Sequence, residues 1–194
     1  MNKIITLIQC YAENLSALSV SKRLGTSYVS IQKHYEIFRF LSAKICEEEY
    51  EELADKQCEY EEYFYLESSK KLKREAIFDA HNFLSFDYDE HIYTLIMPSL
   101  HIYKTQMIED QIEDSYINEF KKFKRENKII KVSKRLNNIV RFWEYFEKSI
   151  VKYKGVNNDK FAYFLKEFEF KYNHSKDDTI NLLIQAYFKV SLKR

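Results

Sequence analysis

The sequence contains very few of the residues that interrupt regular structure. Only two glycines, Gly25 and Gly155, and one proline occur in 194 residues. A loop-rich all-β fold depends on both residue types at its turns, so that class is not expected. A phosphate-binding loop built on clustered glycines is excluded for the same reason. Hydrophobic residues make up 45% of the chain and aromatic residues 16%, which is ample material for a core.

Cysteine clusters and long apolar runs are also missing. Cys10, Cys46 and Cys58 lie far apart and form neither a CxxC pair nor a zinc-type cluster with histidine, so a disulfide framework and a structural zinc site are not supported. No stretch resembles a signal peptide, and the longest uncharged run, residues 92–102, is too short to span a bilayer. We therefore expect a cytoplasmic protein without a membrane partner.

Charge is strongly segregated although the net charge is only +1. Residues 44–67 hold ten acidic residues and two lysines, whereas residues 121–154 hold twelve basic residues and three acidic ones. A basic block of that density, interleaved with aromatic residues, fits a surface that contacts nucleic-acid phosphates. A solvated helix face is the alternative. Within this block we predict DNA contacts for Lys131, Lys134, Arg135 and Arg141.

The first part of the chain predicts a helix-turn-helix. Helical patterns over residues 3–12 and 16–24 are followed by Gly25, which suits a tight turn with positive φ. A third helix begins after Ser27, a plausible N-cap, with a buried side formed by Val29, Ile31, Tyr35 and Phe38. This arrangement would direct Tyr28, Gln32 and Lys33 toward the major groove and place Arg39 near phosphates. An ordinary helical hairpin gives the same pattern.

Beyond an acidic helix or linker at residues 44–56, the pattern changes to strands. Residues 58–66, 77–88 and 91–97 are dense in aromatic and branched residues and predict a three-stranded meander, with residues 87–90 as a turn. Helices are predicted at residues 117–123, 138–153, 159–172 and 179–192, and a short strand at 128–132. Lys166, Glu167 and Glu169 are interpreted as exposed helix charges. A three-stranded meander followed by helices indicates an α/β or α+β domain after the helix-turn-helix module.

The segment covering residues 136–174 resembles the C-terminal block of DDE-type transposases of bacterial insertion sequences. The residues that match in order and spacing are Asn137, Ile139, Phe142, Trp143, Lys152, Gly155, Phe161, Leu165, Lys166, Glu167, Glu169, Lys171, Tyr172 and Asn173. A weaker likeness extends upstream over nearly the whole chain. The resemblance implies the α/β fold class, with a helix-turn-helix DNA-binding module at residues 1–43 and an acidic linker or helix at 44–56. An RNase H-like transposase domain, built from a mixed sheet with C-terminal helices, would follow at 57–194.

In that family, acidic residues from distant segments hold two Mg²⁺ or Mn²⁺ ions that promote in-line phosphoryl transfer. Carried over to this chain, the catalytic and metal-binding positions are Glu61, Asp110 and Asn137. Each has an alternative: Glu61 as a solvated strand end, Asp110 as a loop residue, Asn137 as a helix cap. Val140 stands where the family has a glutamate, with Glu144 one turn further on as a second candidate.

Three functional hypotheses follow. The first is a transposase that binds terminal inverted repeats as a homodimer or higher oligomer and catalyses metal-dependent DNA strand cleavage and transfer. The second is a non-catalytic DNA-binding protein derived from such an enzyme. The third is a helical interaction protein that shares only the ancestry. The first hypothesis needs Glu61, Asp110 and Asn137 to form a working metal site, and the second does not. DNA affinity that depends on salt distinguishes both from the third hypothesis.

Overall fold

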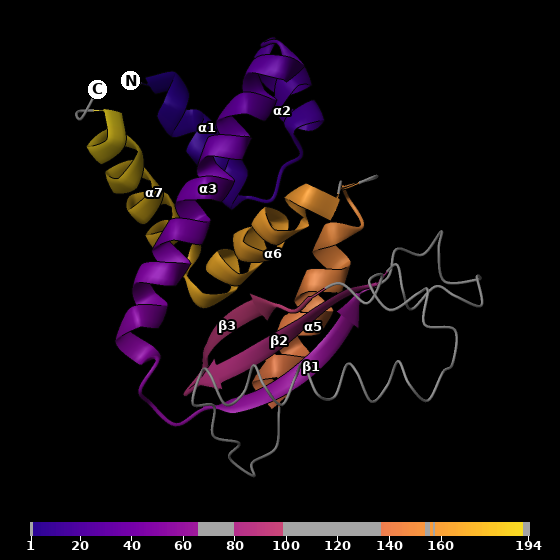
Figure 1. The fold of residues 1–194 in the computed structure, drawn as a ribbon. Helices are drawn as coiled ribbons and strands as arrows, with labels where there is room; N and C mark the ends of the chain where they lie inside the picture. The colour runs from indigo at the N-terminus through magenta and orange to yellow at the C-terminus, as the bar shows by residue number, and fades with distance from the viewer. Residues whose placement is uncertain (1, 66–79, 99–136, 154–155, 157, 192–194) are drawn as a thin grey trace. The chain divides into compact units, whose positions relative to one another are not determined.

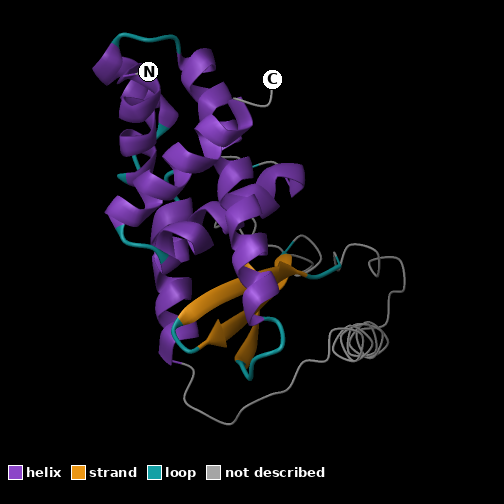
Figure 2. Cartoon of the chain, turned by 90° about the vertical axis from the view of Figure 1, so that its left-hand side faces the viewer, coloured by secondary structure: helices purple, strands orange, loops and turns teal. Residues whose placement is uncertain are grey.

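A computed structural model describes residues 2–65, 80–98, 137–153, 156 and 158–191. The chain divides into two compact units. The helical unit comprises Met1–Asp55 together with Val140–Arg194, and the sheet unit comprises Lys56–Ile139. Figure 1 labels the elements of both, and Figure 2 distinguishes the helices of the first from the strands of the second. No described helix has both the length and the apolar character needed to cross a membrane.

The helical unit is built around one long helix, α3 (Tyr28–Leu53). Helices α1 (Asn2–Ala12), α2 (Ala17–Leu24), α6 (Asn158–Asn173) and α7 (Lys176–Ser191) all pack against it. The first and last helices, α1 and α7, also pack against each other (Figure 1). From Val140 onward, α5 (Asn137–Ile150) belongs to this unit as well.

Aromatic side chains dominate the interior of the helical unit. Tyr11 meets the rings of Tyr35 and Phe38 edge-on, with centroids 5.2 and 5.5 Å away. A second aromatic group joins α5 to α6, where Phe146 contacts Phe168 at 5.7 Å. The predicted buried side of α3 is confirmed for Ile31, Tyr35 and Phe38. It is wrong for Val29, which is 58% exposed because the first turn of α3 extends beyond the core.

The sheet unit contains three antiparallel strands in sequence order: β1 (Glu59–Tyr65), β2 (His81–Tyr88) and β3 (His91–Ile96). The predicted three-stranded meander is therefore confirmed. Cross-strand partners share a face of the sheet, and one such row is Glu61, Ser85 and Thr94. The mixture of helices and strands agrees with the expected α/β class in its coarse form. The helix predicted at 117–123 and the strand predicted at 128–132 lie outside the described residues.

The observed division differs from the one expected from the sequence. Helices α6 and α7 pack with α3 and α1, so the C-terminal segment joins the N-terminal helices in one unit. Of the two alternatives for residues 44–56, an acidic helix or a linker, the helix is observed as far as Leu53, where α3 ends. An acidic side chain of this segment binds α6, since Glu47 pairs with Lys166 at 3.1 Å.

A buried cluster of three charges joins α3 to α6, and we call it the Glu167 cluster. Arg39 Nε donates to Glu167 Oε2 at 2.6 Å, and Lys171 Nζ donates to Glu167 Oε1. Lys171 Nζ also donates to Asn14 Oδ1 at 3.1 Å, which brings in the loop after α1. Glu167 is fully buried. The expectation that Glu167 and Glu169 are exposed is therefore wrong, since both have 0% relative exposure.

Aromatic rings complete the Glu167 cluster. The Arg39 guanidinium lies 3.9 Å from the centre of the Phe164 ring, and Lys171 Nζ lies 3.7 Å from the centre of the Tyr11 ring. Such contacts stabilise a cation where water is excluded. Burial opposes ionisation of Glu167, but Lys171 and Arg39 outweigh it and hold the pKa of its carboxyl below its usual value. Burial lowers the pKa of Lys171 to about 8.

Glu167→Gln tests the energetic importance of this cluster. We expect a loss of about 3–5 kcal/mol in the free energy of unfolding, because two buried cations lose their counter-charge. Urea titration followed by circular dichroism measures it. The control is Glu144→Gln, which removes an exposed carboxylate paired with Lys148 at 3.7 Å; it should change stability by less than about 0.5 kcal/mol. Similar losses in the two variants would contradict the prediction.

A second link depends on pH, and it joins α3 to His174, the residue that follows α6. His174 Nε2 lies 2.8 Å from Glu49 Oε1, and His174 Nδ1 lies 2.8 Å from the carbonyl oxygen of Phe170. Burial lowers the pKa of His174, but the bonds to Glu49 and Phe170 outweigh it, so the pKa is raised. Both acceptors are satisfied together only by the doubly protonated ring.

The stabilisation from protonated His174 is complete below the pKa of histidine in the unfolded chain. It is lost as pH rises through the higher pKa of the folded state. We therefore expect His174→Gln to remove part of the fall in unfolding free energy between about pH 6 and pH 8. Urea titrations at several pH values measure the slope, and Glu49→Gln should flatten it in the same way. An unchanged slope in His174→Gln would refute this.

Candidate nucleic-acid interface

The turn between α2 and α3 has one defined conformation. Gly25 has φ 59° and ψ 28°, which is left-handed, and its N–H donates to the carbonyl oxygen of Ser21. The N–H of Thr26 donates to the same oxygen at 3.3 Å, and Ser21 Oγ donates to the carbonyl oxygen of Thr26 at 2.7 Å. The predicted tight turn with positive φ at Gly25 is thus confirmed. These bonds orient α3 relative to α2.

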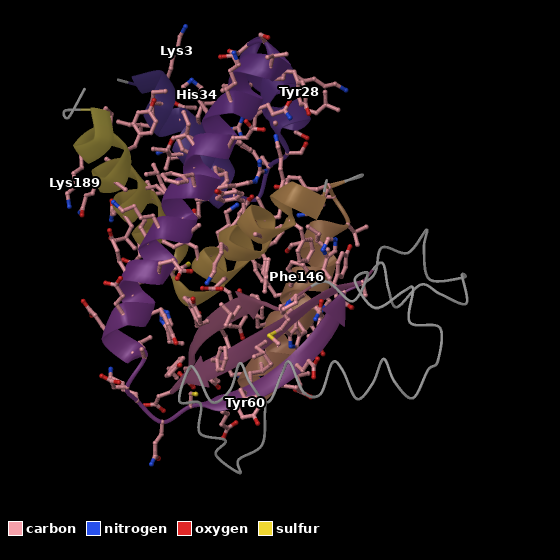
Figure 3. The ribbon with its side chains drawn as sticks, viewed as in Figure 1. Lys3, Tyr28, His34, Tyr60, Phe146 and Lys189 are labelled. Atoms are coloured by element: carbon pink, nitrogen blue, oxygen red, sulfur yellow. The ribbon has the colours of Figure 1, made fainter. Side chains whose placement is uncertain are left out.

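The turn presents the N-terminus of α3 to solvent. Tyr28 is 44% exposed, and Figure 3 shows it at the start of α3, beside α2. Ser27 precedes the helix but makes no capping hydrogen bond through its side chain, so the first N–H groups of α3 face outward with the positive end of the helix dipole. From residue 14 to residue 35 the chain has no acidic residue and three basic ones, Lys22, Arg23 and Lys33. The charged side chains of this segment are all basic, and the apolar side chains of Leu18, Leu24 and Val29 are exposed among them.

Most of the predicted DNA-contacting residues that the structure describes are accessible. Tyr28, Lys33 and Arg141 are exposed and Gln32 is partly exposed. Arg39 needs a correction: it is 7% exposed and its guanidinium is bound to Glu167, so it is not available to a phosphate. A helical pattern does not reveal that a residue 128 positions away supplies its partner. Lys131, Lys134 and Arg135 lie outside the described residues.

The predicted metal site is only partly described. Glu61 lies on β1, half-buried, opposite Ser85. Asn137 is the first residue of α5, and its side chain lies outside the description, as does the whole of Asp110. Across the described ranges, no three His, Cys, Asp or Glu side chains are grouped closely enough to hold a metal ion. Val140, 48% exposed, has no oxygen to offer in place of the expected glutamate.

One contact nevertheless brings the start of α5 to the strands of the sheet unit. Asn138 Nδ2 donates to Asp87 Oδ1 at 3.1 Å, and the same oxygen accepts from the N–H of Glu90 at 2.8 Å. Asp87 is the cross-strand partner of Glu59, so two carboxylates occupy that row of the sheet. Asp87 was predicted at the end of a strand and the start of a turn, with no functional role. Its position at the end of a predicted strand was the feature of the sequence that could have marked it as a candidate site residue.

Comparisons with protein-family models, with curated proteins and with solved structures each found no match. The resemblance to transposases stays a prediction from the residues that carry it.

Replacing Gly25 tests the turn. Among the described residues, and apart from Gly25 and its two chain neighbours, no heavy atom lies within 4 Å of the position that a Cβ at Gly25 would occupy. The backbone conformation is therefore what favours glycine here. We expect Gly25→Ala to lower the free energy of unfolding by about 1–2 kcal/mol. Gly25→Asn should cost clearly less, because asparagine tolerates this conformation, as Asn14 does here at φ 55°. Urea titration measures both, and equal losses would show that strain is not the cause.

Proposed function

We propose that this chain binds double-stranded DNA through the end of α2, the Gly25 turn and the start of α3. The observation that carries the proposal is the hydrogen-bonded Gly25 turn, which joins Lys22 and Arg23 at the end of α2 to the exposed start of α3. That combination is what a helix-turn-helix needs: one helix crosses the backbone while the N-terminal residues of the next reach base edges. Residues 14–35 contain no carboxylate. The neighbouring carboxylate of Glu13 lies 3.9 Å from Arg23 and 2.7 Å from Lys176.

The side chains divide into two roles. Lys22 and Arg23, in the last turn of α2, suit phosphate oxygens, and such contacts position a protein on DNA without reading sequence. Tyr28, Gln32 and Lys33 suit the groove, where amide and ammonium groups bond to base edges. Arg39 takes no part in this proposal because Glu167 holds it in the core.

Strand cleavage and transfer, the transposase reaction, is the second candidate. The Asn138–Asp87 hydrogen bond favours it, since it brings the start of α5 to acidic residues of the sheet. The family chemistry would need Glu61, Asp110 and Asn137 to hold Mg²⁺ or Mn²⁺. The described residues do not supply a fitting set, and Val140 replaces one carboxylate with an apolar side chain. We therefore propose DNA binding without strand cleavage as the first candidate function and the transposase reaction as the second.

The salt dependence of DNA binding tests the proposal. The probe is a fluorescent duplex of about 30 base pairs taken from the DNA flanking the gene, read by anisotropy at several salt concentrations. Replacing both Lys22 and Arg23 with Gln should reduce the slope of log K against log salt by about 1.8, since each lost phosphate contact contributes about 0.9. Lys189→Gln, on α7 (Figure 3), should leave the slope unchanged.

The same duplex with Mn²⁺ distinguishes the two candidates. Nicked product would favour the transposase reading, and binding without nicking supports the proposal. Absent binding, or an affinity insensitive to salt, would overturn both.

A further inference from the structure

The solvent-facing side of α3 carries a continuous row of exposed side chains, which we call the α3 stripe. Because 3.6 residues make one helical turn, residues three and four apart share a face. The α3 stripe consists of Val29, Lys33, Glu36, Ile37, Phe40, Lys44 and Glu47, all classed as exposed. The opposite side of α3 packs against α1, α2, α6 and α7.

Three large apolar side chains lie within the α3 stripe. Val29 is 58% exposed, Ile37 42% and Phe40 54%. Single exposed apolar residues are ordinary. Three of them along one face of one helix, flanked by charges, form the kind of seam that a second helix covers. The stripe is therefore suited to helix pairing.

The charges of the stripe indicate which helix pairs with it and in which direction that helix runs. Along α3 the signs run Lys33, Glu36, Lys44, Glu47, and they are antisymmetric about Phe40. Lys33 and Glu47 each lie seven positions from Phe40, and Glu36 and Lys44 each lie four. A second α3 laid antiparallel across Phe40 would place every lysine opposite a glutamate. A parallel pairing in register would place like charges opposite each other, which is unfavourable.

We propose that a second copy of this chain docks on the α3 stripe, antiparallel, with its two-fold axis at Phe40. Glu47 Oε1 bonds to Lys166 at 3.1 Å, and Glu36 pairs with Lys160, so neighbouring lysines hold both carboxylates at the edge of the stripe. Each carboxylate accepts several hydrogen bonds, so a lysine of the other copy can bind as well. This self-association goes beyond the proposed function because it requires no DNA.

The first test is the oligomeric state of the full chain without DNA. Sedimentation equilibrium over a range of concentrations should show a reversible dimer, and Phe40→Glu should raise its dissociation constant by about tenfold or more, because two carboxylates would meet at the axis. The control Val151→Glu changes a side chain that is 67% exposed but lies outside the stripe, and it should dimerise like the original chain. A monomer at all concentrations, or an undiminished dimer in Phe40→Glu, would overturn the proposal.

The second test reads the orientation. Lys33→Cys and Glu47→Cys are purified separately and oxidised mildly, alone and mixed. The mixture should form a covalent dimer, whereas Lys33→Cys alone should not, because position 33 faces position 47 of the other copy. The native thiols Cys10, Cys46 and Cys58 are buried and give little background. A covalent dimer of Lys33→Cys alone would contradict the antiparallel arrangement.

Lys33 belongs both to the α3 stripe and to the predicted DNA contacts. The DNA experiment therefore uses Lys22 and Arg23, which lie on α2 and outside the stripe. Loss of DNA binding with an intact dimer would remove only the proposed function. Loss of the dimer with intact DNA binding would remove only this inference.

Discussion

The buried carboxylate of Glu167 is the constraint on which the helical unit depends. It accepts from Arg39 on α3 and from Lys171 one turn along α6, and Lys171 also binds Asn14 in the loop after α1. Three segments distant in sequence therefore meet at one charged group that has no access to water. Buried ions must be fully paired to be tolerated, so this geometry admits few alternative packings of α6 on α3.

Because the Glu167 cluster and the aromatic core occupy the inner side of α3, the outer side is left for interactions with other molecules. The two proposals, which share Lys33, use overlapping parts of that outer surface. Its N-terminal end is basic and joined to α2 by the Gly25 turn, which suits DNA. Its middle carries Ile37 and Phe40 among charges of alternating sign, which suits a second copy. One rigid helix can serve both purposes because its orientation is determined by the buried side.

Most predictions that rest on local pattern agree with the structure, and the burial predicted for Val29 is an exception. Alternating and aromatic-rich runs predicted the three strands, and helical spacing predicted that Ile31, Tyr35 and Phe38 are buried. Predictions that needed a distant partner did not agree. Arg39 was expected near phosphates and Glu167 on the surface, yet each is buried against the other. Charged residues are normally exposed, and helical spacing alone does not reveal the rare pair that is not.

The sequence by itself determined the turn at Gly25, the order of helices and strands, and the segregation of acidic and basic residues. These properties depend on backbone conformation and on neighbours within a few positions, so they can be read along the chain. Only the tertiary structure decided that α6 and α7 pack with the N-terminal helices, that Asp87 meets Asn138, and which charges are buried. Those outcomes depend on desolvation and ion pairing between residues far apart in sequence, which no local pattern records.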